Sequence, residues 1–194
     1  MTTTADELRR VALEEFAAAG YHATSIQQIA DRAGVSKATV LYHFASKEVL
    51  LESALAPAID QLDGILGRAR LAAMRTGGEQ RAEFLRQFVD FLLQHRSAAS
   101  IFVNQATTLG DVPIVRRANA EIQLVSGYLE ENVGSLDEKV RFGVALGGAA
   151  YLLAGAPLAM PVQDLDALRA ALITVLGDLL SVAPALASTS TTSD

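Results

Sequence analysis

The stretch TSIQQIADRAGVSKATVLYHFASK, residues 24–47, predicts two short helices joined by a tight turn. In its first half, apolar residues recur at the spacing of one helix face, at Ile26, Ile29, Ala30 and Ala33. Gly34 then supplies the turn, because glycine reaches a left-handed backbone conformation without steric cost. The pattern therefore predicts a helix-turn-helix whose first helix packs against the rest of the protein.

The ends of both helices carry capping residues. Thr24 is expected to cap the first helix, and Gln27, three residues later, completes a T-x-x-Q capping box. Val35 fills the corner of the turn, and Ser36 is expected to cap the second helix. The start of each helix is thus set by local chemistry.

The second helix has a buried side and a polar side. Val40 and Phe44 point inward, and the residues left on or beside the exposed side are Lys37, Ala38, Thr39, Tyr42 and His43. A small residue permits close approach to DNA, while hydroxyl, imidazole and ammonium groups suit base edges and phosphates in the major groove. The alternative is an ordinary helical hairpin inside a bundle, which the spacing alone does not exclude.

The amino-acid sequence around this helix-turn-helix resembles the TetR/AcrR family of bacterial transcription regulators. The resemblance covers about the first fifty residues in one uninterrupted register. It rests on Phe16, Gly20-Tyr21, Thr24-Ser25-Ile26, Ile29-Ala30, Ala33-Gly34-Val35-Ser36-Lys37, Thr39, Tyr42-His43-Phe44 and Ser46-Lys47-Glu48.

The resemblance implies a set of DNA-contacting residues in this segment. They are Thr24, Ser25, Ser36, Lys37, Ala38, Thr39, Leu41, Tyr42, His43 and Lys47. Lys47, in the first turn of the helix that Ser46 caps, is implied to contact the DNA backbone, beside amides that favour phosphate. Leu41 departs from the family, in which many members carry tyrosine at that position. A leucine there is suited to contact with a thymine methyl group instead.

Composition places the chain among helical proteins with a sizeable core. Of its 194 residues, 51% are hydrophobic and 20% charged, and no convincing strand pattern is present. Without cysteine the chain has neither disulfides nor thiolate chemistry. The start, MTTTADELRR, lacks the features of a signal peptide, and no uninterrupted apolar stretch has the length of a membrane span. We therefore expect a cytoplasmic protein with no membrane segment.

The net charge of −6 is unevenly distributed. Residues 48–194 account for all of it, whereas between Phe16 and Lys47 three cations face Asp31 alone. A modest positive patch of this kind is compatible with DNA binding and predicts few phosphate contacts in each subunit.

Periodicity and breakers predict an all-α protein of about nine helices. The expected helices after the helix-turn-helix and its preceding helix, 6–19, begin at Ser46 and at about residues 80, 98, 111, 137 and 164. The first of these is expected to run toward Gly67 and to be kinked or interrupted at Pro57. We divide the chain into a DNA-binding domain, residues 1–47, an effector-binding and dimerisation domain, 48–183, and a disordered tail, 184–194.

A broad apolar face on the helix at 80–95 belongs in the middle of a bundle. Aromatic stripes are found both in cores and in ligand pockets, so two interpretations stay open for these residues. The candidates for binding a small, largely apolar effector are Phe88, Phe91, His95, Phe102, Gln105 and Tyr128. Gln105 lies on an apolar stripe, where its amide needs a partner. No metal or cofactor is expected.

The last two helices, about 137–155 and 164–182, are expected to form the interface of a homodimer. The first is rich in glycine and alanine, which permit close helix approach, and the second carries a leucine-rich side. Two helices from each subunit would give a four-helix bundle. The alternative is that they only complete the core of a monomer.

The resemblance implies a ligand-responsive DNA-binding regulator, most often a repressor, that binds a palindromic operator of double-stranded DNA as a dimer. A helical dimeric scaffold for protein partners is the alternative. It is disfavoured because the second helix is polar, whereas partner-binding helices expose apolar anchors. An enzyme is disfavoured because the sequence has no phosphate-binding loop, no G-x-S-x-G motif and no metal-ligand spacing among its three histidines.

Overall fold

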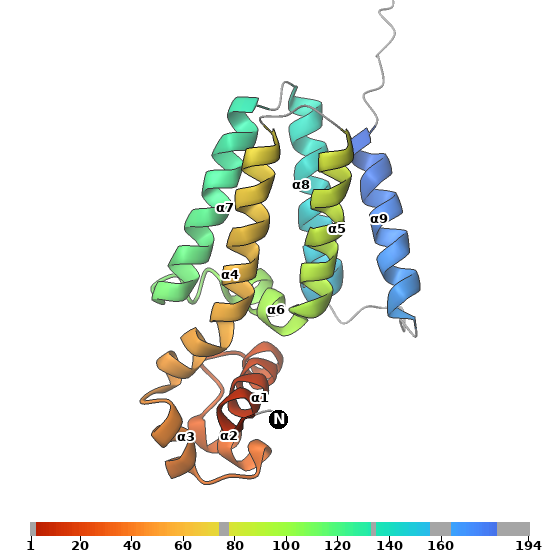
Figure 1. Ribbon diagram of the computed structural model, residues 1–194. Helices are drawn as coiled ribbons and strands as arrows, with labels where there is room; N and C mark the ends of the chain where they lie inside the picture. Colours follow the sequence, from red (N-terminus) through yellow and green to blue (C-terminus); the bar gives the residue numbers. More distant parts are fainter. Residues whose placement is uncertain (1–2, 74–77, 133–134, 156–163, 182–194) are drawn as a thin grey trace, which may run out of the picture.

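The computed structural model describes residues 3–73, 78–132, 135–155 and 164–181, and the regular elements in these ranges are all helices (Figure 1). This confirms the predicted all-α class. In chain order the elements are α1 (Thr4–Ala19), α2 (Ile26–Ala33), α3 (Lys37–His43), α4 (Lys47–Ala73), α5 (Gly78–Gln94), α6 (Arg96–Gln105), α7 (Pro113–Asn132), α8 (Leu136–Ala150), the π-helical turn η1 (Tyr151–Gly155) and α9 (Leu165–Ser181).

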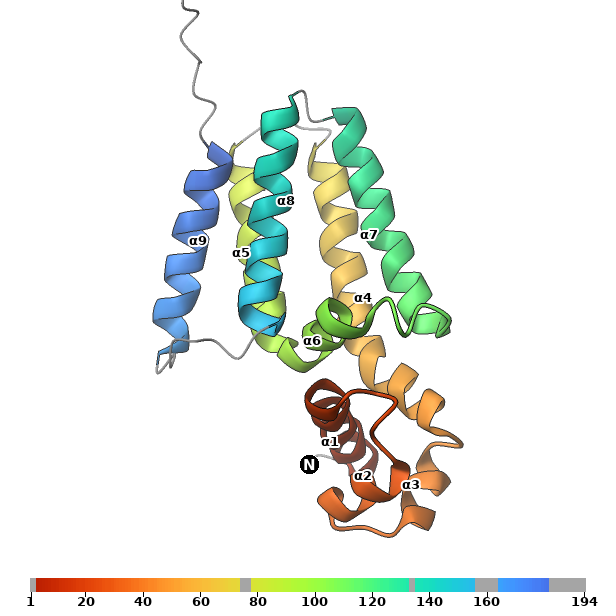
Figure 2. The ribbon, with the colours of Figure 1, turned by 180° about the vertical axis from the view of Figure 1, so that it is seen from behind.

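The first three helices form a small unit at one end of the molecule (Figures 1 and 2). α1 begins with a capping box between Thr3 and Asp6 and ends at Gly20, whose φ of 90° removes the chain from the helix. The core of the unit consists of fully buried apolar side chains on all three helices, at Leu8, Phe16, Ile29 and Val40. α1 thus packs against the helix-turn-helix and completes a three-helix unit.

The remaining helices form a bundle above this unit, with α4 packed between α5 and α7, and α9 packed on α5 and α8. The short helix α6 lies across the lower end of the bundle, next to the N-terminal unit (Figure 2). It packs against both α1 and η1. α6 and α4 are therefore the elements of the bundle that pack against the first helix of the chain.

α4 joins the two parts and runs without interruption through Pro57 to Ala73, beyond the predicted end near Gly67. Figure 1 shows the helix changing direction after its first turns, as it leaves the N-terminal unit. Proline removes one backbone donor and crowds the preceding turn, which bends a helix without ending it when the flanking turns are well packed. Leu55, Ala58 and Ile59 beside the proline are buried.

The sequence misplaced two helix ends in the bundle. The sequence predicted a short helix over 98–109, whereas α6 ends at Gln105 and the chain turns through 106–112 before α7. The helix predicted over 137–155 is α8 followed by the π-helical turn η1, where the carbonyl of Leu153 accepts a hydrogen bond from Arg96 Nε at 3.3 Å. The predicted tail, residues 184–194, lies outside the described residues.

α8 and α9 have an inner face and an outer face. Inward, α8, η1 and α9 complete the core of the subunit with Ala145, Ala149, Leu153, Leu172, Leu176 and Leu180. Outward, the same three elements expose large apolar side chains at Leu136, Val140, Val144, Tyr151, Leu152, Leu165 and Val175. The inner face thus completes the core of the subunit, and the role of the outer face as a dimer interface stays a prediction. None of the helices within the described ranges is both long and apolar enough to cross a membrane.

Candidate nucleic-acid interface and ligand cavity

The N-terminal end of α2 is capped one residue later than the sequence predicted. Ser25, not Thr24, is the cap: its hydroxyl accepts from Gln28 N at 3.2 Å, and Gln28 Oε1 accepts from Ser25 N at 2.7 Å. Thr24 is buried, and its hydroxyl donates to the carbonyl of Gly20 at 2.8 Å. The predicted T-x-x-Q box with Gln27 is therefore wrong, because the Thr24 hydroxyl is used to close the preceding turn.

The turn and the start of α3 follow the sequence prediction. Gly34 adopts the left-handed conformation, with φ 69° and ψ 28°, and its N–H and that of Val35 return to carbonyls of the last turn of α2. Ser36 caps α3, since its hydroxyl accepts from Thr39 N at 3.0 Å. The orientation of α3 on α2 is thereby fixed by short-range hydrogen bonds.

α3 presents one face to solvent and buries the other. Val40 is fully buried and Phe44, directly after the helix, is 4% exposed, as predicted. Tyr42 is 85% exposed and Leu41 42% exposed. Ser25, Ser36, Lys37, Ala38 and His43 are exposed as well, and Thr39 is half-buried. All the predicted DNA-contacting residues except Thr24 and Lys47 therefore lie on or beside one open surface.

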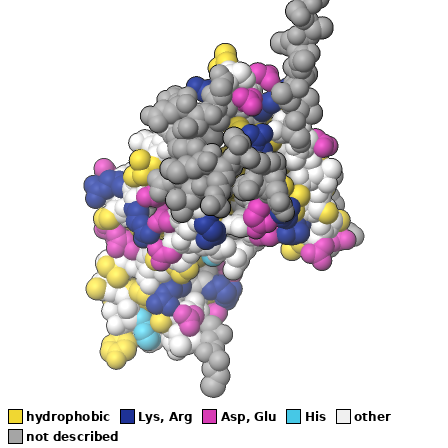
Figure 3. All heavy atoms as spheres, turned by 45° about the horizontal axis from the view of Figure 1, so that its top comes forward, with side chains coloured by type: hydrophobic (Ala, Val, Ile, Leu, Met, Phe, Trp, Pro, Cys, Tyr) yellow, Lys and Arg dark blue, Asp and Glu magenta, His cyan; other side chains and the backbone are white. Residues whose placement is uncertain are grey.

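The surface of the molecule carries mixed charges. In the face that Figure 3 shows, Lys and Arg side chains alternate with Asp and Glu side chains, and hydrophobic and histidine side chains lie together at the tip of the N-terminal unit. Affinity for DNA at such a surface depends on shape and base contacts as much as on charge.

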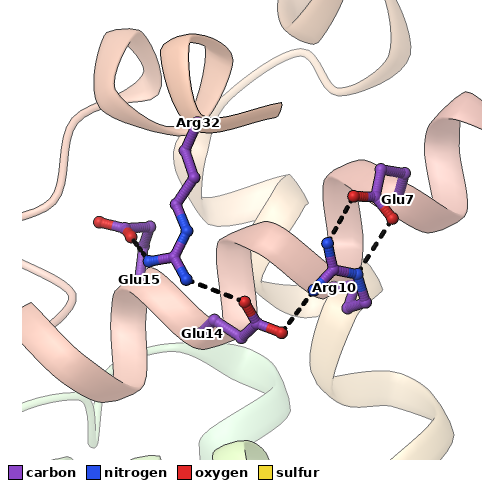
Figure 4. Close-up of polar contacts among 5 residues, drawn as sticks. All are labelled: Glu7, Arg10, Glu14, Glu15 and Arg32. Atoms are coloured by element: carbon purple, nitrogen blue, oxygen red, sulfur yellow. Dashed lines mark hydrogen bonds and ion pairs between the residues drawn. The ribbon is translucent and has the colours of Figure 1, made fainter. Parts of the chain in front are cut away.

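Within the N-terminal unit, Arg32 is neutralised by two carboxylates of α1. Its guanidinium pairs with Glu15 and, at 3.1 Å, with Glu14, which also accepts from Arg10 at 2.6 Å (Figure 4). Lys37 is different, since it makes no hydrogen bond or ion pair with any residue that the structure describes. The predicted positive patch is therefore reduced to the cation at the start of α3.

Lys47 is engaged inside the protein. Its ammonium donates to the carbonyls of Tyr21 and Thr24, both at 2.9 Å, and lies 4.3 Å from the centre of the Tyr21 ring. Burial lowers the pKa of this lysine below its ordinary value. The Lys47 side chain thus ties the start of α4 to the turn before α2, and its contact with DNA stays a prediction.

The bundle contains a cavity of about 550 Å³ that is partly open to solvent, and its volume is within the range of ligand sites in proteins. Helices α4 to α8 all contribute to its wall. Five of the lining residues are phenylalanines, namely Phe84, Phe88, Phe91, Phe102 and Phe142, and the others include Leu62, Leu66, Gly143, Gly147 and Lys139. Phe88, Phe91 and Phe102 were predicted as ligand-contacting residues, and the structure brings them together in one wall.

Three of the predicted ligand residues do not belong to the described lining. His95 Nε2 lies 2.7 Å from Gln61 Oε1 of α4, and burial lowers the pKa of the imidazole. The side chain of Tyr128 lies outside the described residues. Throughout the described ranges, no three His, Asp or Glu side chains are grouped to hold a metal ion.

Gln105 is the third predicted ligand residue that does not belong to the described lining. Its amide joins α6 to the end of α1. Gln105 Nε2 donates to the carbonyl of Phe16 at 2.7 Å, and Gln105 Oε1 accepts from Tyr21 N at 2.8 Å. We call these two hydrogen bonds the Gln105 bridge. The sequence showed that this amide needed a partner, and the partner is the backbone around Gly20.

Sequence reasoning missed Lys139, Phe142 and the two lining glycines of α8. A signal was present, because positions 139, 142, 143, 146, 147 and 150 fall on one face of a helix. That face was assigned to packing between helices, since small residues permit close approach. In the structure an added Cβ at Gly143 or Gly147 meets no atom within 4 Å, so both glycines border open space.

Comparison with known proteins places the N-terminal segment in one family. Residues 8–54 match the model of the bacterial regulatory proteins of the tetR family. The chain is 34% identical over 113 residues to the HTH-type transcriptional repressor KstR2 of Mycolicibacterium smegmatis, covering 56% of this chain and 52% of that protein. It is 37% identical over 107 residues to the transcriptional activator FasR of the same species, covering 53% and 47%. The matches thus span about half the length of these relatives.

Solved structures share the fold over most of the chain. The ketosteroid transcriptional regulator KstR2 of Mycobacterium tuberculosis superposes with a TM-score of 0.71 at 18% identity, covering 93% of this chain and 94% of that one. A TetR-family regulator from Bordetella parapertussis gives a TM-score of 0.67 at 18% identity, covering 91% and 95%. At this identity the similarity establishes the arrangement of helices alone.

Proposed function

Because the chain belongs to the TetR family of bacterial transcription regulators, we propose that it is a ligand-responsive DNA-binding repressor. The observation that carries the proposal is the exposed polar face of α3, capped at Ser36 and fixed on α2 by Gly34. The relatives are named regulators, and none is named for an enzymatic activity. The division into domains at residue 47 is part of the same proposal.

α3 is the recognition helix. Its length of seven residues and its small N-terminal Ala38 suit insertion into the major groove. Tyr42 and His43 supply groups for base edges or phosphates, and Lys37 supplies the cation for the DNA backbone. Ser25 and Ser36, exposed at the N-terminal ends of α2 and α3, are placed for phosphate contacts.

The protein acts as a homodimer through the outer faces of α8 and α9. Val140, Val144 and Tyr151 follow one another at helical spacing, and each is more than half exposed in the isolated subunit. A monomer rarely leaves so many apolar side chains of one surface in water, whereas a two-fold axis would pair this face with its copy. The dimer would then present two α3 helices to successive major grooves of a palindromic operator.

The cavity is the site of a small, largely apolar effector. Its wall of phenylalanine, leucine, alanine and glycine offers burial of apolar surface and few hydrogen bonds. An effector weakens DNA binding if it binds better to a conformation in which the spacing of the two recognition helices does not fit the operator. DNA then weakens effector binding by the same factor.

A protein-interaction scaffold is the second candidate, and the exposed apolar face of α8 and α9 is the observation that favours it. The two candidates differ in what α3 binds. In a scaffold, substitutions in α3 would not change binding to DNA. The exposed face of its bundle would bind a partner other than a second copy of the chain.

The test is the anisotropy of a labelled random-sequence duplex pool, titrated with protein at several salt concentrations. We expect binding that weakens as the salt concentration rises. The slope of the logarithm of the binding constant against the logarithm of the salt concentration is expected to be shallow, because few cations face outward. Lys37→Ala is expected to reduce the slope by about one for each subunit bound, whereas Arg86→Ala, on the outside of α5, leaves it unchanged. No binding at low salt, or equal binding by both variants and wild type, would favour the scaffold.

A further inference from the structure

Four residues that line the cavity are also exposed at the surface of the subunit. The other lining residues are buried or half-buried, including the phenylalanines of α5 and α6. A lining residue that also contacts solvent marks the place where the cavity meets the surface, and we call this place the mouth. The residues of the mouth come from three helices and are Val103 of α6, Ile122 of α7, and Gly143 and Gly147 of α8.

The mouth lies between α7 and α8, two helices that follow one another in the chain but pack on different neighbours. α7 packs on α4, whereas α8 packs on α9 and η1. In the view of Figure 2, α7 and α8 lie on the near side of the bundle, with α6 across its lower end. The mouth therefore opens on the side of the bundle.

The two glycines lie at the boundary between two faces of α8. The face toward the cavity includes Phe142 and Leu146. The outer face is the exposed apolar surface that we propose for the dimer. With about 3.6 residues per turn, Gly143 and Gly147 fall between these two faces. They thus form the edge of the mouth on the side of α8.

Packing within the subunit does not explain either glycine. A glycine inside a helix costs about 1 kcal/mol relative to alanine, so it needs a compensating gain. Among the described glycines, only Gly20 and Gly34 have a positive φ. A Cβ added at Gly143 or Gly147 would meet no atom within 4 Å, so no other helix approaches closely there. The missing side chains therefore leave open space at the mouth.

We infer that the effector enters and leaves the cavity through this mouth, and that Gly143 and Gly147 keep the mouth open in the folded subunit. The inference rests on the proposed effector site and specifies how that site is reached. Exchange through a preformed opening requires no local unfolding of the bundle. The width of the mouth then sets the rates of exchange, and the phenylalanine wall behind it sets the affinity.

The test is the binding of N-phenyl-1-naphthylamine, a neutral probe that fluoresces in apolar surroundings, to the full-length protein in a stopped-flow instrument. For wild type we expect an observed rate that rises linearly with probe concentration, because no earlier opening step limits entry. Gly147→Leu is expected to slow association and dissociation alike, by about tenfold, and so to leave the Kd nearly unchanged. Ile122→Trp narrows the mouth from α7 and is expected to act in the same way.

Three controls separate the mouth from other parts of the subunit. Gly148→Leu makes the same change at the next residue of α8, which is exposed but outside the lining. Leu124→Trp is the corresponding control on α7. Both are expected to leave the two rate constants unchanged. Phe88→Leu alters the wall behind the mouth and is expected to speed dissociation without slowing association.

Three results would overturn the inference. One is an observed rate that reaches a ceiling shared by wild type and both mouth variants, because entry would then depend on an opening elsewhere. Another is an equal effect of Gly147→Leu and Gly148→Leu, since the glycines would then serve contact with a second copy of the chain. The third is the absence of any fluorescence rise in wild type.

These results are separate from the test of DNA binding, because the probe is titrated without DNA. If the duplex pool binds while the probe does not enter, the inference about the mouth fails and the DNA-binding role stands. If the probe enters as expected while no duplex binds, the mouth stands and the regulator proposal fails.

Discussion

Tyr42 is the side chain of α3 on which we base the first prediction, because 85% of its surface is exposed and its removal leaves no cavity. Tyr42→Ala is expected to weaken binding to a selected operator duplex by about 1–3 kcal/mol, the value of a good base contact. Its thermal unfolding is expected to match wild type. Fluorescence anisotropy gives the Kd values, with Val49→Ala, exposed on α4, as the control. Equal affinities for both variants would remove Tyr42 from the interface.

His95 gives a prediction of pH dependence. Burial lowers its pKa in the folded state below the ordinary 6.5, so the unfolded chain takes up the proton first as the pH falls. The His95 contribution is complete above about pH 6.5 and is lost as the pH falls from there toward the lowered folded-state pKa. Urea titrations of wild type and His95→Gln should therefore show less loss of stability in the variant between neutral and mildly acidic pH. Parallel losses in the two proteins would contradict this assignment.

At the scale of single residues, the sequence predicted what neighbouring residues decide. Gly34 and Ser36 act within one turn of themselves, and both were placed correctly. Thr24 and Ser25 are both good caps, each followed by a glutamine three residues later, and only the Thr24–Gly20 hydrogen bond separates them. The resemblance implied that Lys47 contacts the DNA backbone, which stays a prediction. Its hydrogen bonds to the carbonyls of Tyr21 and Thr24 were not foreseen, because these partners lie more than twenty residues earlier in the chain.

The Gln105 bridge is the link between α6 and α1, and its loss is the prediction at the scale of elements. Gln105→Leu keeps the size of the side chain but leaves the carbonyl of Phe16 and the N–H of Tyr21 without these partners. We expect a loss of about 1–3 kcal/mol in the free energy of unfolding. Operator affinity is expected to depend less on effector, since the hydrogen-bonded link between α6 and α1 is lost.

The neighbouring amide provides the control for this prediction. Asn104 is exposed, and its side chain donates to Ser100 within α6 itself. Asn104→Leu should change neither the unfolding free energy nor the response of DNA binding to effector by as much. If the two variants behaved alike in both measurements, the bridge would have no particular role.

At the scale of elements, helices were predictable wherever one face is apolar over several turns, as on α5 and α9. The ends were less predictable, because α6 ends where the chain must turn toward α7, and α8 passes into η1 where Arg96 bonds to a carbonyl. The two backbone partners of Gln105 lie 84 and 89 positions earlier in the chain, and no local pattern indicates such contacts.

At the scale of the whole molecule, the dimer interface gives the next prediction. Val144 is 59% exposed in the isolated subunit, on the outer face of α8. Val144→Glu would bury an unpaired carboxylate in the interface and is expected to give monomers, measured by sedimentation equilibrium. Val49→Glu places the same change on an exposed position of α4 and should leave the dimer intact. A dimeric Val144→Glu protein would contradict the proposed interface.

The cavity was only partly predictable, since it arises from the convergence of five helices. Phe88, Phe91 and Phe102 were identified because aromatic residues at helical spacing are suited to either a core or a pocket. Whether aromatic residues form a core or line a pocket depends on the side chains opposite them. Here the residues on α8 include Gly143 and Gly147, which leave the space open. In the sequence, the small size of Gly143 and Gly147 indicated close packing between helices. In the fold, the same small size leaves part of the cavity volume open.

Selection of random duplexes by the purified full-length protein tests the central claim most directly. The account predicts recovery of a palindrome whose half-sites lie about one helical turn apart, matching two α3 helices related by a two-fold axis. Recovery of no consensus at low salt and without ligand, or of a single half-site bound by one subunit, would contradict it.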